Sequence, residues 1–331
     1  MQMANPGSGR PLPGGLLLND RTMNYDVIII GGSYAGLSAA LVLGRSLRRV
    51  LVIDAGKPCN RQTPHSHGFL TRDGEIPAQL AAIAREQVSQ YPTVTFVATT
   101  ATGANHITGG LAVHTAEGET YSARRLILAT GLIDVMPDIP GFAECWGRSV
   151  LHCPYCHGYE VHGQPLGILA NGETAYEMAR LIQQWSRQLT LFTNGPSTLT
   201  NEQQQGLAQL AIPIVETPLT AIEHTDGFLT ALVLANGQRV SPVAMFARVP
   251  LLQSSDIAQQ LGCQLTEHNF VQVTEFGATS VPGVFAAGDT TTMMRQVANA
   301  VAGGAKAGAI VNSELITDDL LHLTQPAVAE R

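Results

Sequence analysis

Two cysteines separated by two residues are the part of the sequence best suited to chemistry. Cys153 and Cys156 belong to the segment Leu-His-Cys-Pro-Tyr-Cys-His-Gly, which covers 151–158. This spacing allows a short disulfide loop, and at a helix start it lowers the pKa of a thiol. A thiolate that attacks a disulfide also needs a proton donor for the departing sulfur, and His157 suits work near neutral pH. The segment therefore predicts a redox site made of Cys153, Cys156 and His157.

Two other interpretations of the cysteine pair stay open. Zinc could be bound by Cys153 and Cys156 together with His152 or His157, and Cys145 could contribute a further ligand. Structural zinc normally takes four ligands, often in two pairs, and the sequence has no second CxxC. We therefore predict no metal. In the other interpretation, both thiols are buried and inert.

A glycine-rich turn near the start of the chain indicates a nucleotide site. The pattern predicts a buried strand at 26–30, a turn at 31–36, a helix at 37–47 and a second strand at 50–53. In a dinucleotide-binding turn three small residues serve the tight turn, the approach to the pyrophosphate and helix–strand packing, and here they are Gly31, Ser33 and Gly36. Asp54, at the end of the second strand, is placed to bond a ribose hydroxyl.

The same pattern of strand, turn, helix and strand recurs between residues 166 and 192. The chain is therefore predicted to be α/β, with two Rossmann-like (three-layer ββα) dinucleotide-binding domains, the second inserted into the first. We predict a discontinuous FAD-binding domain at 23–140 and 264–320, and an inserted NAD(P)H-binding-like domain with the CxxC at 141–263. A mobile N-terminal tail is predicted at 1–22 and a C-terminal tail at 321–331.

Several motifs in a fixed order resemble the low-molecular-weight thioredoxin reductases, within the pyridine nucleotide–disulfide oxidoreductase superfamily. They are the glycine turn, Ala-Thr-Gly at 129–131, the CxxC, Val-Phe-Ala-Ala-Gly-Asp at 284–289 and Arg-Gln-Val at 295–297. The resemblance covers nearly everything from Tyr25 to about Asp319. It implies an FAD domain built from both chain ends.

The resemblance also implies roles for individual residues. Cys156 would lie nearer the flavin, and Cys153 would attack the substrate disulfide. Asp289 would approach the ribityl–phosphate part of FAD, and Arg295 the edge of the isoalloxazine. The remaining residues that the resemblance adds to the FAD site are Tyr34, Ala35, Arg61, Gln62, Thr130, Gly131, Gly288, Gln296 and Val297. The family usually has Asp directly after the second cysteine, whereas here it is His157, which looks more like the subgroup with the fungal dithiol oxidases.

The second glycine turn is degenerate. Its three positions are Ala170, Gly172 and Ala175, so the glycine of the tight turn is lost. The family has a His-Arg-Arg cluster after the next strand to grip the 2′-phosphate of NADPH, but here no Arg or Lys occurs between Arg187 and Arg239. NADPH binding is therefore doubtful, and some family members take electrons from ferredoxin or another donor instead.

These observations predict an FAD-dependent thiol–disulfide oxidoreductase that reduces a protein disulfide, with ferredoxin or an unknown molecule as donor. Its partner would be a thioredoxin-like protein or a small disulfide or dithiol, and the resemblance implies a homodimer. The alternatives are a dithiol oxidase that uses oxygen, an ordinary NADPH-dependent thioredoxin reductase with a divergent site, and a non-catalytic flavin-binding protein.

Composition narrows the functional class further. The 331 residues are 45% hydrophobic and 14% charged with net charge −7, so the chain is not disordered as a whole, and it has no basic run for nucleic acid. No apolar stretch has the length of a secretory signal or a membrane span, so we expect a cytoplasmic protein. Cys59 and Cys263 are predicted to pack as small hydrophobic side chains.

Overall fold

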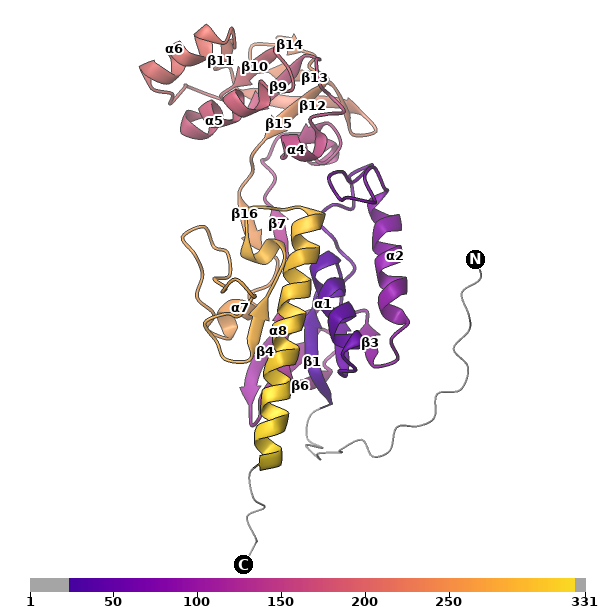
Figure 1. The fold of residues 1–331 in the computed structure, drawn as a ribbon. Coiled ribbons are helices and arrows are strands. Elements are labelled where there is room, and N and C mark those ends of the chain that lie inside the picture. The colour runs from indigo at the N-terminus through magenta and orange to yellow at the C-terminus, as the bar shows by residue number, and fades with distance from the viewer. Residues whose placement is uncertain (1–23, 325–331) are drawn as a thin grey trace, which may run out of the picture.

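The computed structural model describes residues 24–324, so the predicted tail at 1–22 and residues 325–331 lie outside it. Figure 1 shows two α/β parts, stacked one above the other and linked by a narrow connection. Both parts contain a parallel sheet, so the predicted fold class with two Rossmann-like units is confirmed. Within 24–324, no helix combines the length and the apolar character needed to cross a membrane.

The larger part is built on a seven-stranded sheet of order β3-β2-β1-β6-β5-β4, with β17 also paired to β6. Its strands are β1 (Tyr25–Ile30), β2 (Val50–Ile53), β3 (Val94–Val97), β4 (Ala101–Ile107), β5 (Gly110–Thr115), β6 (Thr120–Leu128) and β17 (Val284–Ala286). Pairing is parallel from β3 to β6 and to β17, and antiparallel in the β4–β5–β6 meander. The central strand β1 is apolar because helices cover one face of the sheet and the segment around residues 257–271 covers the other.

Four helices belong to this part: α1 (Tyr34–Arg45), α2 (Pro77–Ser89), α7 (Ile257–Gln260) and α8 (Val297–Thr324). A short 3₁₀ helix at Asp289–Thr291 follows β17. Helix α8 continues to Thr324. Residues 321–324 are therefore helical, although they were predicted to belong to the C-terminal tail.

The smaller part has a five-stranded parallel sheet of order β11-β10-β9-β15-β8. Its strands are β8 (Val150–Leu151), β9 (Leu166–Leu169), β10 (Leu189–Phe192), β11 (Ile214–Val215) and β15 (Ala244–Ala247). A three-stranded antiparallel sheet lies against it: β12 (Leu219–Thr225), β13 (Phe228–Leu234) and β14 (Arg239–Val240). The helices are α3 (Phe142–Cys145), α4 (Pro154–His157), α5 (Gly172–Ile182) and α6 (Asn201–Gln209).

An antiparallel ribbon of two short strands joins the two parts (Figure 1). It consists of β7 (Leu132–Asp134) and β16 (Leu251–Gln253). After β16 the chain returns at once to the larger part, where Ile257 and Cys263 pack into the core beneath the seven-stranded sheet. The division at residue 263 therefore stays a proposal, and this packing favours an earlier one near β16.

Some strands do not follow a simple apolar pattern. Strand β6 runs without a break through Arg124 and Arg125. Both arginines bond to Asp318 near the end of α8, so charge is accommodated in the middle of the strand. Neither β4 nor the three-stranded sheet was expected.

Glycine brings the N-terminal helix α1 and the C-terminal helix α8 into close contact. A methyl group on Gly304 would collide with the backbone of Ala35 in α1, and one on Gly308 would lie 2.9 Å from the carbonyl oxygen of Ala39. This contact binds the end of the chain to the glycine-rich turn near its start.

We expect Gly304→Ala to lower the free energy of unfolding by about 1–3 kcal/mol, because the added methyl forces the two helices apart. Gly303→Ala is the matched control, since its new methyl would meet its nearest atom, the backbone nitrogen of Gly288, at an ordinary 3.7 Å. That control should be neutral or slightly stabilising, because alanine is the better helix former. Urea unfolding of both variants measures the difference. Equal effects would show that helix spacing does not depend on Gly304.

Candidate active site

The two cysteines of the CxxC form a disulfide at the start of helix α4. Cys153 is the extended N-cap residue, and Pro154 occupies the first helical turn, where its missing N–H costs nothing. The backbone N–H groups of Cys156 and His157 both donate to the carbonyl oxygen of Cys153, at 3.2 Å each. The Cα atoms of the cysteines are 5.3 Å apart. The predicted placement of the CxxC at a helix start is therefore right.

A cleft lies between the two parts of the molecule and reaches the disulfide. Its lining residues include Cys59, Asn60, Gln62, Thr63, His67, Asp134, Trp146, His152, Cys156, His157, Asp289, Arg295, Gln296 and Val297. Cys156 belongs to this lining and Cys153 does not. Cys263 is buried as predicted, but the prediction for Cys59 is wrong: its side chain is exposed at the cleft, with Sγ 3.7 Å from Asp289 Oδ2.

Two histidines flank the disulfide in the cleft. The rings of His152 and His157 are 6.5 Å apart and arranged edge to face, and His152 stacks on Trp146 at 5.9 Å. Burial, and then the positive charge of Arg295, lower the pKa of His152 to about 4. Burial, and then His152, lower the pKa of His157 to about 4. Beside the intact disulfide His157 is thus neutral at pH 7, whereas its prediction as a proton donor rests on the ordinary pKa of histidine.

A buried ion pair between Asp134 and Arg295 lies next to His152. Arg295 donates to Oδ1 and Oδ2 of Asp134 at 2.5 and 3.1 Å, and its Nε lies 3.4 Å from Asp289 Oδ2. Trp146 Nε1 donates to Asp134 at 3.2 Å. Burial opposes ionisation of Asp134, but the hydrogen bonds and charge of Arg295 outweigh it and lower its pKa. Sequence analysis missed Asp134, and a carboxylate within the apolar run Leu-Ile-Asp-Val-Met at 132–136 was the available signal.

The first glycine turn forms a cradle suited to a pyrophosphate. Methyl groups on Gly31 or Gly36 would collide with the backbone of Ala129 or of Gly31, so only glycine fits. Ser33 is the extended N-cap residue of α1, and its hydroxyl makes no cap hydrogen bond. The first-turn amides, which include those of Tyr34 and Ala35, have no intrahelical acceptor and face the space where a phosphate would bind.

Other predicted FAD residues lie along the same edge of the seven-stranded sheet. The side chain of Asp54 follows β2 and lies against the backbone of Gly32. Thr130 and Gly131 follow β6, and their carbonyl oxygens accept hydrogen bonds from Ser254. Gly288, at φ 80°, precedes Asp289 and touches Ala35. Gln62, Asp289, Gln296 and Val297 line the cleft. Arg61 is not in that lining and donates to the carbonyl oxygen of Pro58 at 3.2 Å. These residues fit FAD, although Arg61 has no evident part in the site.

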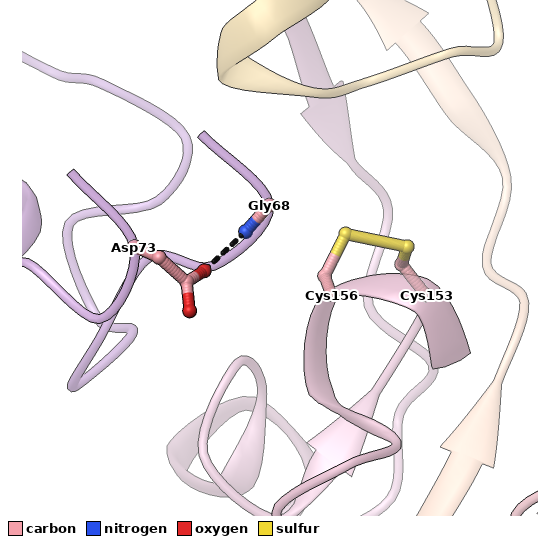
Figure 2. Close-up of a disulfide and its surroundings, with 4 residues drawn as sticks. All are labelled: Gly68, Asp73, Cys153 and Cys156. Atoms are coloured by element: carbon pink, nitrogen blue, oxygen red, sulfur yellow. Dashed lines mark hydrogen bonds between the residues drawn. A yellow bond between two sulfur atoms is a disulfide. The ribbon is translucent and has the colours of Figure 1, made fainter. Parts of the chain in front are cut away.

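A loop of the larger part closes over the CxxC segment. His67 Nε2 lies 3.4 Å from Glu160 Oε1, three residues beyond His157. The N–H of Gly68 donates to Asp73 at 2.7 Å and shapes the turn that Figure 2 shows on the Cys156 side of the disulfide. Three residues of this loop, His65, Ser66 and His67, line the cleft. Within 24–324, no group of three or more His, Cys, Asp or Glu side chains could hold a metal ion.

The second glycine turn is filled by a side chain of the protein itself. Asn171 caps helix α5, where its Oδ1 accepts from the N–H of Gly172 at 2.8 Å and of Thr198 at 2.9 Å. Its Nδ2 donates to the carbonyl oxygens of Pro196 at 2.9 Å and Thr193 at 3.4 Å. Asn171 therefore ties the helix start to the loop after β10, in the place where a bound dinucleotide would pass.

We expect Asp134→Ala to lower the free energy of unfolding by about 3–5 kcal/mol, because it leaves the buried guanidinium of Arg295 without its main partner. The matched control is Glu223→Ala, which removes the partner of the exposed Arg239 and should change stability by less than about 1 kcal/mol. Denaturant unfolding of both variants measures the difference. A cost for Asp134→Ala as small as that of the control would show that the buried pair does not support the site.

Comparisons with known proteins agree with this geometry. The family model described as "Pyridine nucleotide-disulphide oxidoreductase" matches residues 25–304. A thioredoxin reductase, tcpT, from Claviceps purpurea is 34% identical over 310 residues, which is 88% of this chain and 95% of the relative. An oxidoreductase structure from Agrobacterium tumefaciens is 38% identical with TM-score 0.84 and covers 89% of this chain and 99% of its own.

A putative thioredoxin reductase, TrxB, from Bacillus anthracis is 32% identical with TM-score 0.85 and covers 89% of this chain and 99% of its own. The family implies FAD as cofactor, in agreement with the glycine cradle at α1. The chain belongs to the pyridine nucleotide–disulphide oxidoreductases and is an enzyme of the thioredoxin reductase-like, flavin-dependent disulfide oxidoreductase type.

Proposed function

We propose that this enzyme exchanges electrons between FAD and a thiol or disulfide substrate through Cys153 and Cys156, and that NADPH does not reduce it. The observation that carries this proposal is the side chain of Asn171 at the second glycine turn. In a working dinucleotide site the helix N-terminus offers free amides to the pyrophosphate. At α5 the N–H of Gly172 and that of Thr198 are already bonded to Asn171.

The charges around the second turn also favour this proposal. The loop after β10 carries no arginine or lysine. The N–H of Ser197 in this loop donates to the carboxylate of Glu216 at 3.0 Å. Glu173 stands in the first turn of α5. A 2′-phosphate would meet two carboxylates and no guanidinium there, which is the opposite of what recognition of NADPH requires.

The placement of the cysteines suggests how they divide the work. FAD, held by the cradle at α1 with its ring toward Arg295, would supply or accept two electrons. Cys156 lines the cleft and would face that ring, which leaves Cys153 to form the mixed disulfide with the substrate. In the reducing direction the substrate would be a disulfide such as that of a thioredoxin-like protein, and the donor reduced ferredoxin or another carrier.

The protonation state of His157 favours a second candidate, oxidation of a dithiol. A neutral imidazole takes a proton from an incoming thiol, and the thiolate then attacks Cys153 while Cys156 leaves as thiolate. The second substrate thiol attacks the mixed disulfide, which releases the substrate as a disulfide and leaves Cys153 reduced. The two electrons would pass through FAD to oxygen.

Anaerobic mixing with pyridine nucleotides tests the identity of the donor. We expect the yellow absorbance of the oxidised holoenzyme to persist with NADPH and then NADH, because the bound Asn171 side chain and the acidic loop oppose nucleotide binding. A small dithiol, added as the positive control, should bleach the flavin if the dithiol-oxidase direction operates, and reduced ferredoxin should do so if the reducing direction operates. Rapid bleaching by NADPH would contradict the proposal.

Serine substitutions test the division of labour between the cysteines. We expect Cys153→Ser and Cys156→Ser each to lower turnover by about 10³-fold or more, in oxygen consumption with a dithiol and in reduction of a protein disulfide, since either loss prevents disulfide formation. Cys263→Ser is the control, because Cys263 is buried beneath the larger sheet, and it should retain wild-type turnover. Normal turnover in either active-site variant would exclude the pair from the reaction.

A further inference from the structure

The second histidine of the cleft, His152, has no role in the scheme above. It precedes Cys153 in the sequence as His157 follows Cys156, and the two rings meet edge to face at 6.5 Å. Among the described residues, neither ring has a hydrogen-bonding partner, although histidines held inside a protein for structural reasons are normally bonded. Both rings line the cleft beside Cys156, so their nitrogens are available to the reaction.

The charged groups around His152 and His157 permit protonation of one of the two rings but oppose protonation of both. Arg295 and Asp134 face His152 from the larger part and from the ribbon, and their charges oppose each other. His67 and Glu160 face His157 from the loop and from the segment after α4. Two imidazolium rings at this separation would repel each other in a poorly solvated site, so protonation of one ring suppresses protonation of the other.

We propose that His152 and His157 act together as the proton acceptor for the cysteine pair, with one proton held at a time by either ring. The proposal rests on the proposed thiol–disulfide chemistry at Cys153 and Cys156. In the step that it serves, the substrate thiol gives its proton to the ring pair, and its sulfur bonds to Cys153. The bond between the two cysteines breaks, and its electron pair leaves with Cys156 as thiolate. The imidazolium then stands beside the new thiolate, and net charge is unchanged.

The single proton has a consequence for the reduced enzyme. An imidazolium next to a thiol lowers the pKa of that thiol because it stabilises the thiolate. If either ring can hold the proton, losing one ring leaves the other to hold it, so the thiol pKa changes little, and only the loss of both rings removes the effect. If His152 only packs on Trp146, the loss of His157 alone removes the whole effect.

The test is the pH dependence of thiol alkylation in chemically reduced holoenzyme, with iodoacetamide as probe and mass spectrometry to assign each cysteine. We expect His152→Phe and His157→Phe each to leave the apparent pKa of the more reactive thiol within about 0.3 unit of the wild-type value, because the remaining ring holds the proton. The double variant should raise that pKa by about one unit, since no imidazole is left beside the thiol. His162→Phe is the control: this exposed ring stacks on Tyr159 in the same part of the molecule and should leave the titration unchanged.

Three results would overturn the proposal. A rise of about one unit in His157→Phe alone, with no further rise in the double variant, would make His152 a packing group, and a wild-type titration in the double variant would exclude both rings from the reaction. A rise of the same size in the thiol pKa of His162→Phe would show that any histidine in this part of the molecule has the effect through general electrostatics. His152→Gln replaces His152→Phe if the latter does not fold, with the same expectation. Alkylation needs neither substrate nor electron donor, so its outcome is separate from success or failure of the turnover assays.

Discussion

The ion pair between Asp134 and Arg295 is the interaction on which the cleft depends. Both side chains are less than a tenth exposed, at 9% and 8%, and a charge buried to that degree persists only with a well-bonded partner. Three separate segments meet at the pair. Asp134 ends strand β7 of the connecting ribbon, Arg295 precedes α8, and Trp146 comes from the smaller part. The pair therefore sets the position of the disulfide-bearing part relative to the glycine cradle.

The two Rossmann-like units show how one supersecondary plan serves two purposes. In the larger part, Ser33 caps α1 without a side-chain hydrogen bond, and glycine keeps the turn open for phosphate. In the smaller part, the side chain of Asn171 accepts a hydrogen bond from the N–H of Gly172, the first residue of α5. A side-chain cap stabilises a helix by about 1 kcal/mol, so the second unit gains local stability where an open site would leave amides free. The second unit also carries the CxxC at the edge of the cleft.

The sequence predicts those features that depend on local spacing. The CxxC at a helix start, the turn at Gly31–Gly36 and the strand Val50–Ile53 all follow from residue types a few positions apart. Asp134 could not be identified, because its significance comes from Arg295, 161 residues away. The pKa of His157 could not be predicted for the same reason: burial by distant segments lowers it, and no local pattern records that burial. Continuous β6 shows the same effect, since Asp318 compensates two arginines within a strand.

Burial of the histidines connects the architecture to the redox chemistry. The oxidised disulfide is uncharged, and the surrounding rings, with pKa values of about 4, are uncharged with it at neutral pH. Opening the disulfide creates a thiolate, and a buried thiolate without a countercharge would be costly. A proton on a nearby imidazole removes that cost because positive and negative charge then arise together. The net charge of the cleft can thus stay nearly unchanged through the cycle, and the Asp134–Arg295 pair, already neutralised within itself, supports it without titrating.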